Sequence, residues 1–205
     1  ARVPRGSGLS DPALTRNEIR NGEARGAAAG VLPTYWGFST GDGLTREITG
    51  GGVEAGMSYV EVRFSGTPTV NYAALNFESA TQIAASEGEV WTASYLYKLI
   101  AGSMSNISSL AVRLAQHQAS PTGTVTAPDS QWRRASFTRT ISDTTPDSAR
   151  LRPALFLALT IGQPIDMTLR VGNAQLEKAA TASRYIPTQS AARSRGPGAC
   201  VDGSA

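Results

Sequence analysis

Hydrophobic and polar residues alternate with a period of two along much of the chain between residues 57 and 177. This period is typical of a half-buried β-strand, because successive side chains of a strand point to opposite faces. The clearest case is the segment 165–171, in which every second residue is apolar: Ile165, Met167, Leu169 and Val171. The same pattern predicts strands at 57–64, 70–77, 90–100, 108–116, 132–141, 151–160, 165–171 and 174–177.

Glycine and proline positions refine this prediction. The Gly-Asn pair at 172–173 predicts a turn between the last two strands. The segment 151–160 is the most apolar and is predicted to be central, although Pro153 argues against a central position for its first part. The glycine run at 49–53 predicts a flexible hairpin tip, because it lacks the Lys-Ser/Thr pair and the helix of a phosphate-binding loop. Helical periodicity is weak, and only the segment 76–88 could hold a short helical turn.

Strands of eight to ten residues separated by Ser, Thr, Gly and Pro predict an all-β fold, an antiparallel β-sandwich of the jelly-roll type. We place this single domain at residues 17–188. Residues 1–16 and 189–205 are aperiodic and rich in Pro, Gly, Ser and Arg, so they are predicted to be an N-terminal arm or linker and a flexible C-terminal tail.

Composition excludes several classes of function. The chain of 205 residues is 40% hydrophobic and 17% charged, which describes a globular protein able to bury a core. Its net charge of +3 is concentrated near the two ends rather than in a basic stripe with aromatic residues, so no nucleic-acid partner is expected. No apolar run reaches the roughly 20 residues that span a bilayer, and no secretion signal is visible, so neither membrane insertion nor a signal peptide is expected.

The single cysteine and the single histidine limit the chemistry further. Cys200 alone allows neither an intrachain disulfide nor a zinc site made of four cysteines. Any nucleophilic triad would have to use His117, which follows a predicted strand and is expected to face solvent. Glycosidases need only two carboxylates, but no pair lies in an aromatic context among the candidates Glu47, Glu54, Glu61, Glu78, Glu87 and Glu89. We therefore predict no catalytic residues.

Three segments carry a resemblance to a known group of proteins. Residues 15–24 read TRNEIRNGEA, residues 32–38 read LPTYWGF, and residues 174–188 contain Ala-Gln-Leu-Glu followed by Ala-Ser-Arg-Tyr-Ile-Pro-Thr. Together they resemble the carbohydrate-binding-module-type jelly rolls of phage tail, fibre and other virion structural proteins. Lys178 and Arg184 depart from the closing pattern of that group.

The resemblance implies a non-enzymatic structural component of a phage or phage-like particle: a decoration, fibre, spike or tail protein. The expected location is the virion, and the expected partners are other virion proteins, further copies of the chain and host surface glycans. A stand-alone carbohydrate-binding module is the alternative. A polysaccharide hydrolase or lyase is a third reading.

Aromatic residues provide the candidate sugar-binding site, because the apolar face of a pyranose stacks on an aromatic ring. Trp91, Tyr95 and Tyr97 share one face of the strand 90–100, and Tyr59 and Tyr72 could lie beside them. If that face points outward the residues form a sugar platform, and if it points inward they belong to the core.

Two further sites follow from the residues and the resemblance. Related sugar-binding jelly rolls often tie their opening strand to their closing strand with calcium, and the matching residues here are Glu23, Asn173 and Glu177. These residues could instead face solvent or arginine, and no other cofactor is expected. Trp132, Arg133 and Arg134 are candidates for an interface, because tryptophan and arginine are enriched at hot spots.

Overall fold

The computed structural model of the chain describes residues 15–78, 83–116, 121–142 and 150–195. Within these ranges the chain forms thirteen β-strands and no helix. One sheet has the spatial order β10 (Arg133–Thr140), β7 (Val90–Gly102), β12 (Ile165–Glu177), β4 (Met57–Gly66), β3 (Leu44–Glu54). We call it the five-stranded sheet.

The second large sheet has six strands. Its order is β2 (Gly37–Ser39), β5 (Tyr72–Asn76), β11 (Arg150–Leu159), β8 (Ile107–Ala115), β9 (Thr122–Thr124), and β6 (Ile83–Ala84) also pairs with β11. A separate ribbon joins β1 (Thr15–Asn17) to β13 (Arg193–Arg195), which lies in the segment that the sequence assigned to the tail. All of these pairings are antiparallel.

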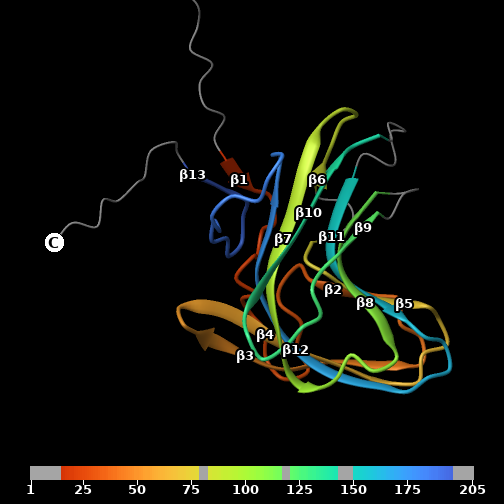
Figure 1. Cartoon of the computed structure of the whole chain (residues 1–205). Coiled ribbons are helices and arrows are strands. Elements are labelled where there is room, and N and C mark those ends of the chain that lie inside the picture. Colours follow the sequence, from red (N-terminus) through yellow and green to blue (C-terminus); the bar gives the residue numbers. More distant parts are fainter. Residues whose placement is uncertain (1–14, 79–82, 117–120, 143–149, 196–205) are drawn as a thin grey trace, which may run out of the picture.

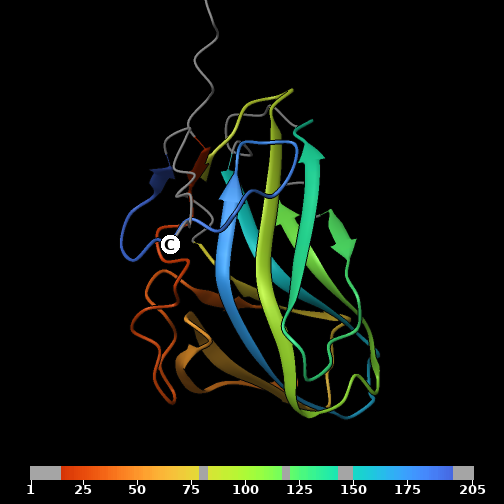
Figure 2. The ribbon, with the colours of Figure 1, turned by 60° about the vertical axis from the view of Figure 1, so that its left-hand side comes forward.

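The two large sheets stack face to face, with β7 and β12 in one layer and β8 and β11 in the other (Figure 1). Figure 2 shows the same layers turned by 60°, with the ribbon β1–β13 beside the five-stranded sheet and away from β8 and β9. The predicted antiparallel β-sandwich of the jelly-roll type is confirmed. Its core lies between the layers, where the alternating residues predicted from the sequence meet, among them Val60, Val62, Phe64, Leu110, Val112 and Leu114.

One predicted turn is wrong. Residues 172–173 do not separate two strands, because β12 continues from Ile165 to Glu177 with a bulge between Gly172 and Gln175. Asn173 takes a left-handed conformation with φ of 51°. A Cβ atom at Gly172 would lie 2.2 Å from the carbonyl oxygen of Ser58, so the close approach of β4 requires glycine there.

A second prediction to be corrected is the glycine-rich hairpin tip. Gly50, Gly51 and Gly52 lie inside the long edge strand β3 and pair with β4, while the tip falls at Ala55 and Gly56. A Cβ atom at Gly52 would lie 2.9 Å from the hydroxyl oxygen of Tyr59, so the missing side chain leaves room for that ring. The sequence pattern missed β3 because its middle has no alternating side chains.

The central position of β11 is as predicted, and Pro153 is accommodated inside it. Pro153 pairs with Leu114 of β8 on one side. On the other side its carbonyl accepts a hydrogen bond from the amide of Phe77, in the gap between the pairings with β5 and β6. The amide hydrogen that proline lacks would point into this gap, so the ladder with β8 stays complete.

The described part of the segment 76–88 forms no helical turn, and Ile83–Ala84 is the short strand β6. In the portions of the chain that the structure describes, no helix has the length and apolar character needed to cross a membrane.

Candidate functional site

The buried side chain of Asn17 helps to join the opening and closing segments of the domain. Its amide nitrogen donates to the carbonyl oxygens of Ala174 (3.1 Å) and Ile186 (3.0 Å). Its amide oxygen accepts from the backbone amides of Ile19 and Leu176, both at 3.1 Å. All four hydrogen-bonding positions of the amide are therefore used, and Asn17 is 0% exposed.

The closing motif has a matching role. Gln175 accepts a hydrogen bond from the backbone amide of Ile186 at 2.6 Å. Glu177, which is 0% exposed, accepts from the backbone amide of Ser183 at 2.9 Å and from its hydroxyl at 2.5 Å. These polar residues of the Ala-Gln-Leu-Glu sequence thus fasten the segment that follows β12 onto the sheet.

The fastened segment covers part of the outer face of the five-stranded sheet. The hydroxyl of Thr92 on β7 donates to the carbonyl oxygen of Ala179 at 2.7 Å. Arg134 on β10 donates to the carbonyl oxygen of Ser183 at 2.6 Å and to the hydroxyl of Ser94. Thr92 and Ser94 face away from the core, yet both are buried beneath this cover.

The three residues predicted to bind calcium are engaged separately. Glu177 binds Ser183, Glu23 forms an ion pair with Arg25 at 3.2 Å, and Asn173 adopts the left-handed conformation of the bulge. Hydrogen bonds of Asn17 also link the opening strand to the closing strand. Over the described residues, no three His, Cys, Asp or Glu side chains gather as metal ligands do.

The aromatic array on β7 points inward. Trp91 is 4% exposed and Tyr95 and Tyr97 are each 1% exposed, so these rings belong to the core and cannot stack on a surface sugar. Their polar atoms are bonded inside the protein: the hydroxyl of Tyr95 donates to the carbonyl oxygen of Ala111 at 3.0 Å, and that of Tyr97 donates to Thr126 at 2.7 Å. The sequence allowed either a surface platform or a core position for these rings, and the structure places them in the core.

Tyr59, by contrast, faces outward and lies beside Trp132, with 6.3 Å between the ring centroids. A cation lies over each ring: Arg170 is 4.3 Å from the centroid of Tyr59, and Lys98 is 5.3 Å from that of Trp132. The structure therefore brings together one residue predicted for sugar binding and one predicted for an interface.

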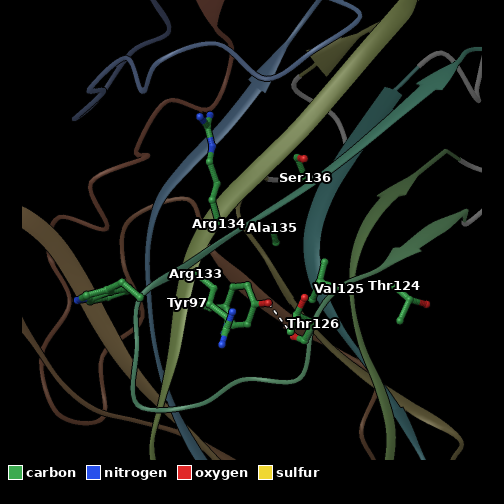
Figure 3. A pocket seen from close by; sticks show the side chains of 9 residues that line it. Tyr97, Thr124, Val125, Thr126, Arg133, Arg134, Ala135 and Ser136 are labelled. Carbon is green, nitrogen blue, oxygen red and sulfur yellow. Dashed lines mark hydrogen bonds between the residues drawn. The ribbon is translucent and has the colours of Figure 1, made fainter.

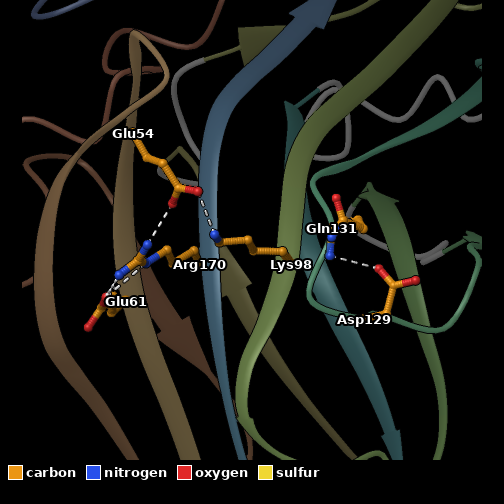
Figure 4. Close-up of polar contacts among 6 residues, drawn as sticks. All are labelled: Glu54, Glu61, Lys98, Asp129, Gln131 and Arg170. Carbon is orange, nitrogen blue, oxygen red and sulfur yellow. Dashed lines mark hydrogen bonds and ion pairs between the residues drawn. The ribbon is translucent and has the colours of Figure 1, made fainter.

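These cations are bound to carboxylates of the same cluster (Figure 4). Lys98 and Arg170 both bind Glu54, at 2.6 Å and 2.5 Å, and Arg170 also binds Glu61 at 2.7 Å. The hydrogen bond from Lys98 holds the pKa of Glu54 below its usual value. Two of the candidate glycosidase carboxylates thus share one guanidinium, whereas a general acid needs a raised pKa.

A pocket of about 440 Å³ lies at the edge of the sandwich, between β10 and the segment that follows β9 (Figure 3). Thr124, Val125 and Thr126 line one side, and Arg133 to Ser136 line the other. Arg133 binds Asp129 through a two-point ion pair, and the carboxylate of Asp129 also accepts from the amide of Gln131 at 3.0 Å (Figure 4). The predicted interface arginines are therefore bonded within the chain.

The outer face of the six-stranded sheet carries a second pair of aromatic rings. Tyr72 of β5 and Phe156 of β11 stack with their centroids 5.4 Å apart and their planes 19° apart. Thr40 donates a hydrogen bond of 2.8 Å to the hydroxyl oxygen of Tyr72 and so orients that ring. The guanidinium of Arg113 on β8 lies 5.4 Å from the centroid of Tyr72 and 5.6 Å from that of Phe156.

Small residues form the floor of this face. Ala74, Ala111, Ala115 and Ala154 alternate with core residues, lie outside the core cluster, and are each at most 1% exposed. An alanine side chain is a single methyl group, so the longer side chains of Tyr72, Phe156 and Arg113 extend further from the sheet than the alanines do. The rings present apolar surface on the outer side of the sheet, with the guanidinium at their side. We call this set of residues the β5–β11–β8 face.

Sequence reasoning named Tyr72 only as a neighbour of another strand and missed Phe156. A signal was present, because Leu155 and Leu157 on either side of Phe156 form one apolar face, which leaves the aromatic ring on the other. His117 and Cys200 lie outside the described residues.

No family model matches the chain, and no curated protein matches it significantly. Among solved structures, it is similar to an arabinose-bound α-L-arabinofuranosidase at 12% identity and a TM-score of 0.58, over 80% of this chain and 26% of that one. The chain thus spans about a quarter of that enzyme. It is also similar to a Stig cyclase from Fischerella sp. TAU, at 10% identity and a TM-score of 0.55, over 83% of this chain and 100% of that one.

A weaker likeness is to a CBM4 protein, at 18% identity and a TM-score of 0.49, over 78% of this chain and 99% of that one. At these identities the similarities describe the fold alone, and one fold hosts unrelated activities.

Proposed function

We propose that this chain is a non-catalytic carbohydrate-binding module that holds a glycan against the β5–β11–β8 face. The observation that carries the proposal is the stacked pair of outward rings, Tyr72 and Phe156, with Arg113 beside it above a floor of alanines. The rings can stack on the apolar faces of sugars, and the guanidinium can donate hydrogen bonds to their oxygens.

The other outward pair, Tyr59 and Trp132, is a weaker candidate. Arg170 and Lys98 already lie over these rings, and their charges are matched by Glu54 and Glu61 within the same cluster. This arrangement supports a role in stabilising the sheet. The lowered pKa of Glu54 supports the non-catalytic part of the proposal.

Affinity electrophoresis and calorimetry against a panel of soluble polysaccharides test the proposal. Tyr72→Ala and Phe156→Ala are each expected to weaken binding about three- to twelvefold, because a sugar would cover about half of a ring whose full burial contributes about 1.5–3 kcal/mol. Trp132→Ala is the matched control and is expected to bind as the unaltered chain does. Equal losses at Trp132 and Tyr72, or no loss at Tyr72 and Phe156, would refute this placement of the site.

A second candidate function is attachment to a larger particle, as a decoration, fibre, spike or tail component. One observation favours it: β1 pairs with β13, so residues 15–17 and 193–195 lie together at one corner (Figure 1). A neighbouring protein could bind both segments there without touching the β5–β11–β8 face. Co-sedimentation of the chain with particles tests this role, and a monomer that never sediments with them would count against it.

A further inference from the structure

The β5–β11–β8 face carries one nearly buried amide, that of Asn76 on β5. Asn76 is 8% exposed, and its side chain forms no hydrogen bond within the described part of the chain. Buried polar groups are almost always hydrogen-bonded, because an amide that loses its water without gaining a partner destabilises the protein. The amide of Asn76 therefore needs a polar partner that solvent or a ligand supplies.

Asn76 lies on one side of the Phe156 ring along the sheet, and Tyr72 lies on the other. Phe156 pairs in register with Ala74. Tyr72 comes two residues before this pair on β5 and Asn76 two residues after it, so both are diagonal neighbours of the ring. Diagonal neighbours share one face of the sheet and lie about 7–8 Å apart. The core residue Leu75 precedes Asn76, which places Asn76 on the outer face.

The free face of the Phe156 ring is turned toward Asn76. Tyr72 stacks on Phe156 with 5.4 Å between the centroids, which covers the face of Phe156 that is turned toward Tyr72. The guanidinium of Arg113 lies 5.4 Å from one centroid and 5.6 Å from the other, so it lies beside the pair and not over the far face of Phe156. A sugar stacked on that far face lies between the ring and the amide of Asn76.

The neighbours of Asn76 on the adjacent strands leave room for a ligand. Ala154 of β11 and Gly37 of β2 pair in register with Asn76, so a methyl group flanks it on one side and no side chain flanks it on the other. Apart from its chain neighbours, no described heavy atom lies within 4 Å of the place where a Cβ atom of Gly37 would stand. A sugar can therefore approach the amide from the side of β2.

The amide of an asparagine offers a donor and an acceptor side by side. Two hydroxyl groups on adjacent carbons of a sugar ring offer the matching acceptor and donor. We infer that Asn76 determines the specificity of the β5–β11–β8 face by binding two adjacent free hydroxyl groups of a sugar stacked on Phe156. This inference rests on the proposed function and adds the class of ligand, a glycan whose internal units keep two adjacent hydroxyl groups free.

Calorimetry with two hexasaccharides of glucose tests the inference. In cellohexaose the units are joined through carbons 1 and 4, so the hydroxyl groups on carbons 2 and 3 of each internal unit are adjacent and free. In laminarihexaose the linkage uses carbon 3, so the internal units have no such pair. The unaltered chain is expected to bind cellohexaose at least about fivefold more tightly, because its internal units can form both hydrogen bonds with Asn76.

Three variants locate the effect. Asn76→Ala is expected to lose at least about fivefold in affinity for cellohexaose and little for laminarihexaose, so that the preference disappears. Asn71→Ala removes the same group at an exposed position just before β5, and is expected to change neither affinity. Gly37→Val leaves the amide in place but fills the open space beside it, and is expected to weaken cellohexaose binding by a similar factor.

The outcomes separate this inference from the proposed function. Equal binding of the two hexasaccharides, tighter binding of laminarihexaose, or unchanged binding by Asn76→Ala would overturn the inference and leave the proposed function intact. If the chain binds only another polysaccharide of the panel, Asn76→Ala is measured on that polymer, and an unchanged affinity overturns the inference. Failure of the folded chain to bind any of these glycans overturns both. The unaltered chain and Gly37→Val keep the test decisive if Asn76→Ala does not fold.

Discussion

Replacing Asn17 by alanine tests whether one amide holds the two ends of the domain together. The substitution removes four buried hydrogen bonds, to the carbonyl oxygens of Ala174 and Ile186 and from the amides of Ile19 and Leu176. Each backbone group left without a partner in the interior costs about 1–3 kcal/mol. The simple sum is about 4–12 kcal/mol, and water entering the space left by the amide will reduce it.

We therefore expect Asn17→Ala to lower the free energy of unfolding by at least about 3 kcal/mol, out of the 5–15 kcal/mol typical of a folded domain. For a domain of this size, that corresponds to a fall in melting temperature of at least about 6 °C. Urea titration followed by circular dichroism measures the first quantity, and calorimetry measures the second. Asn71→Ala, at an exposed position, is the matched control and is expected to cost less than about 0.5 kcal/mol.

The pH dependence of the stability of Asn17→Asp provides a second test. The carboxylate can still accept from the amides of Ile19 and Leu176, but it faces the carbonyl oxygens of Ala174 and Ile186, to which the asparagine donates. Burial beside two acceptors raises the pKa of this aspartate in the folded state above its unfolded value of about 3.9. The folded state then binds more protons, so the variant is most stable at low pH and loses stability as the pH rises through the folded pKa.

Two results would refute this reasoning. The first is a loss below about 1 kcal/mol for Asn17→Ala, since even one unsatisfied group in the interior costs about that much. The second is a difference between Asn17→Asp and the unaltered chain that stays the same at pH 4 and pH 7.

Two smaller predictions concern other buried polar groups. Tyr95→Phe removes the hydrogen bond to the carbonyl of Ala111, so it should cost about 1–2 kcal/mol in urea titration and leave glycan affinity unchanged, whereas lost affinity would contradict the inward orientation of that ring. The pKa of Glu89 is lowered, chiefly by its hydrogen bond from Lys178, so its contribution to stability is present above the unfolded pKa and is lost as the pH falls through the folded pKa. Glu89→Gln should thus be less stable than the unaltered chain at pH 7 and approach it below about pH 4, and a gap that persists in acid would count against this ion pair.

The alternation of side chains predicted the faces of the strands well. Val60, Val62 and Phe64 were assigned to one side of their strand, and all three are fully buried. The antiparallel sandwich followed from such faces, since each apolar face must be covered by another layer. Alternation does not show which face of an isolated strand points inward. The sequence alone therefore could not decide whether Trp91, Tyr95 and Tyr97 lie in the core or on the surface.

The parts that the sequence did not predict depend on contacts between distant residues. The left-handed Asn173 looks like a turn when its neighbours alone are considered, but the pairing of β12 with β7 resumes beyond it and makes it a bulge. Phe156 becomes a candidate for binding only because β5 places Tyr72 beside it. The closing motif was recognisable as a pattern, but its physical role became visible only with the partners of Gln175 and Glu177.

The bulge in β12 also limits how the chain can change in length. Before it, odd-numbered residues such as Leu169 and Val171 point into the core, and after it the even-numbered Ala174 and Leu176 do so. Deleting one residue here would exchange the two faces, driving an amide and a carboxylate into the apolar interior and releasing the closing segment. Homologues that keep the same closure should therefore tolerate substitutions around this point far better than insertions or deletions, and a gap at this place in an alignment would mark a protein that closes its sandwich differently.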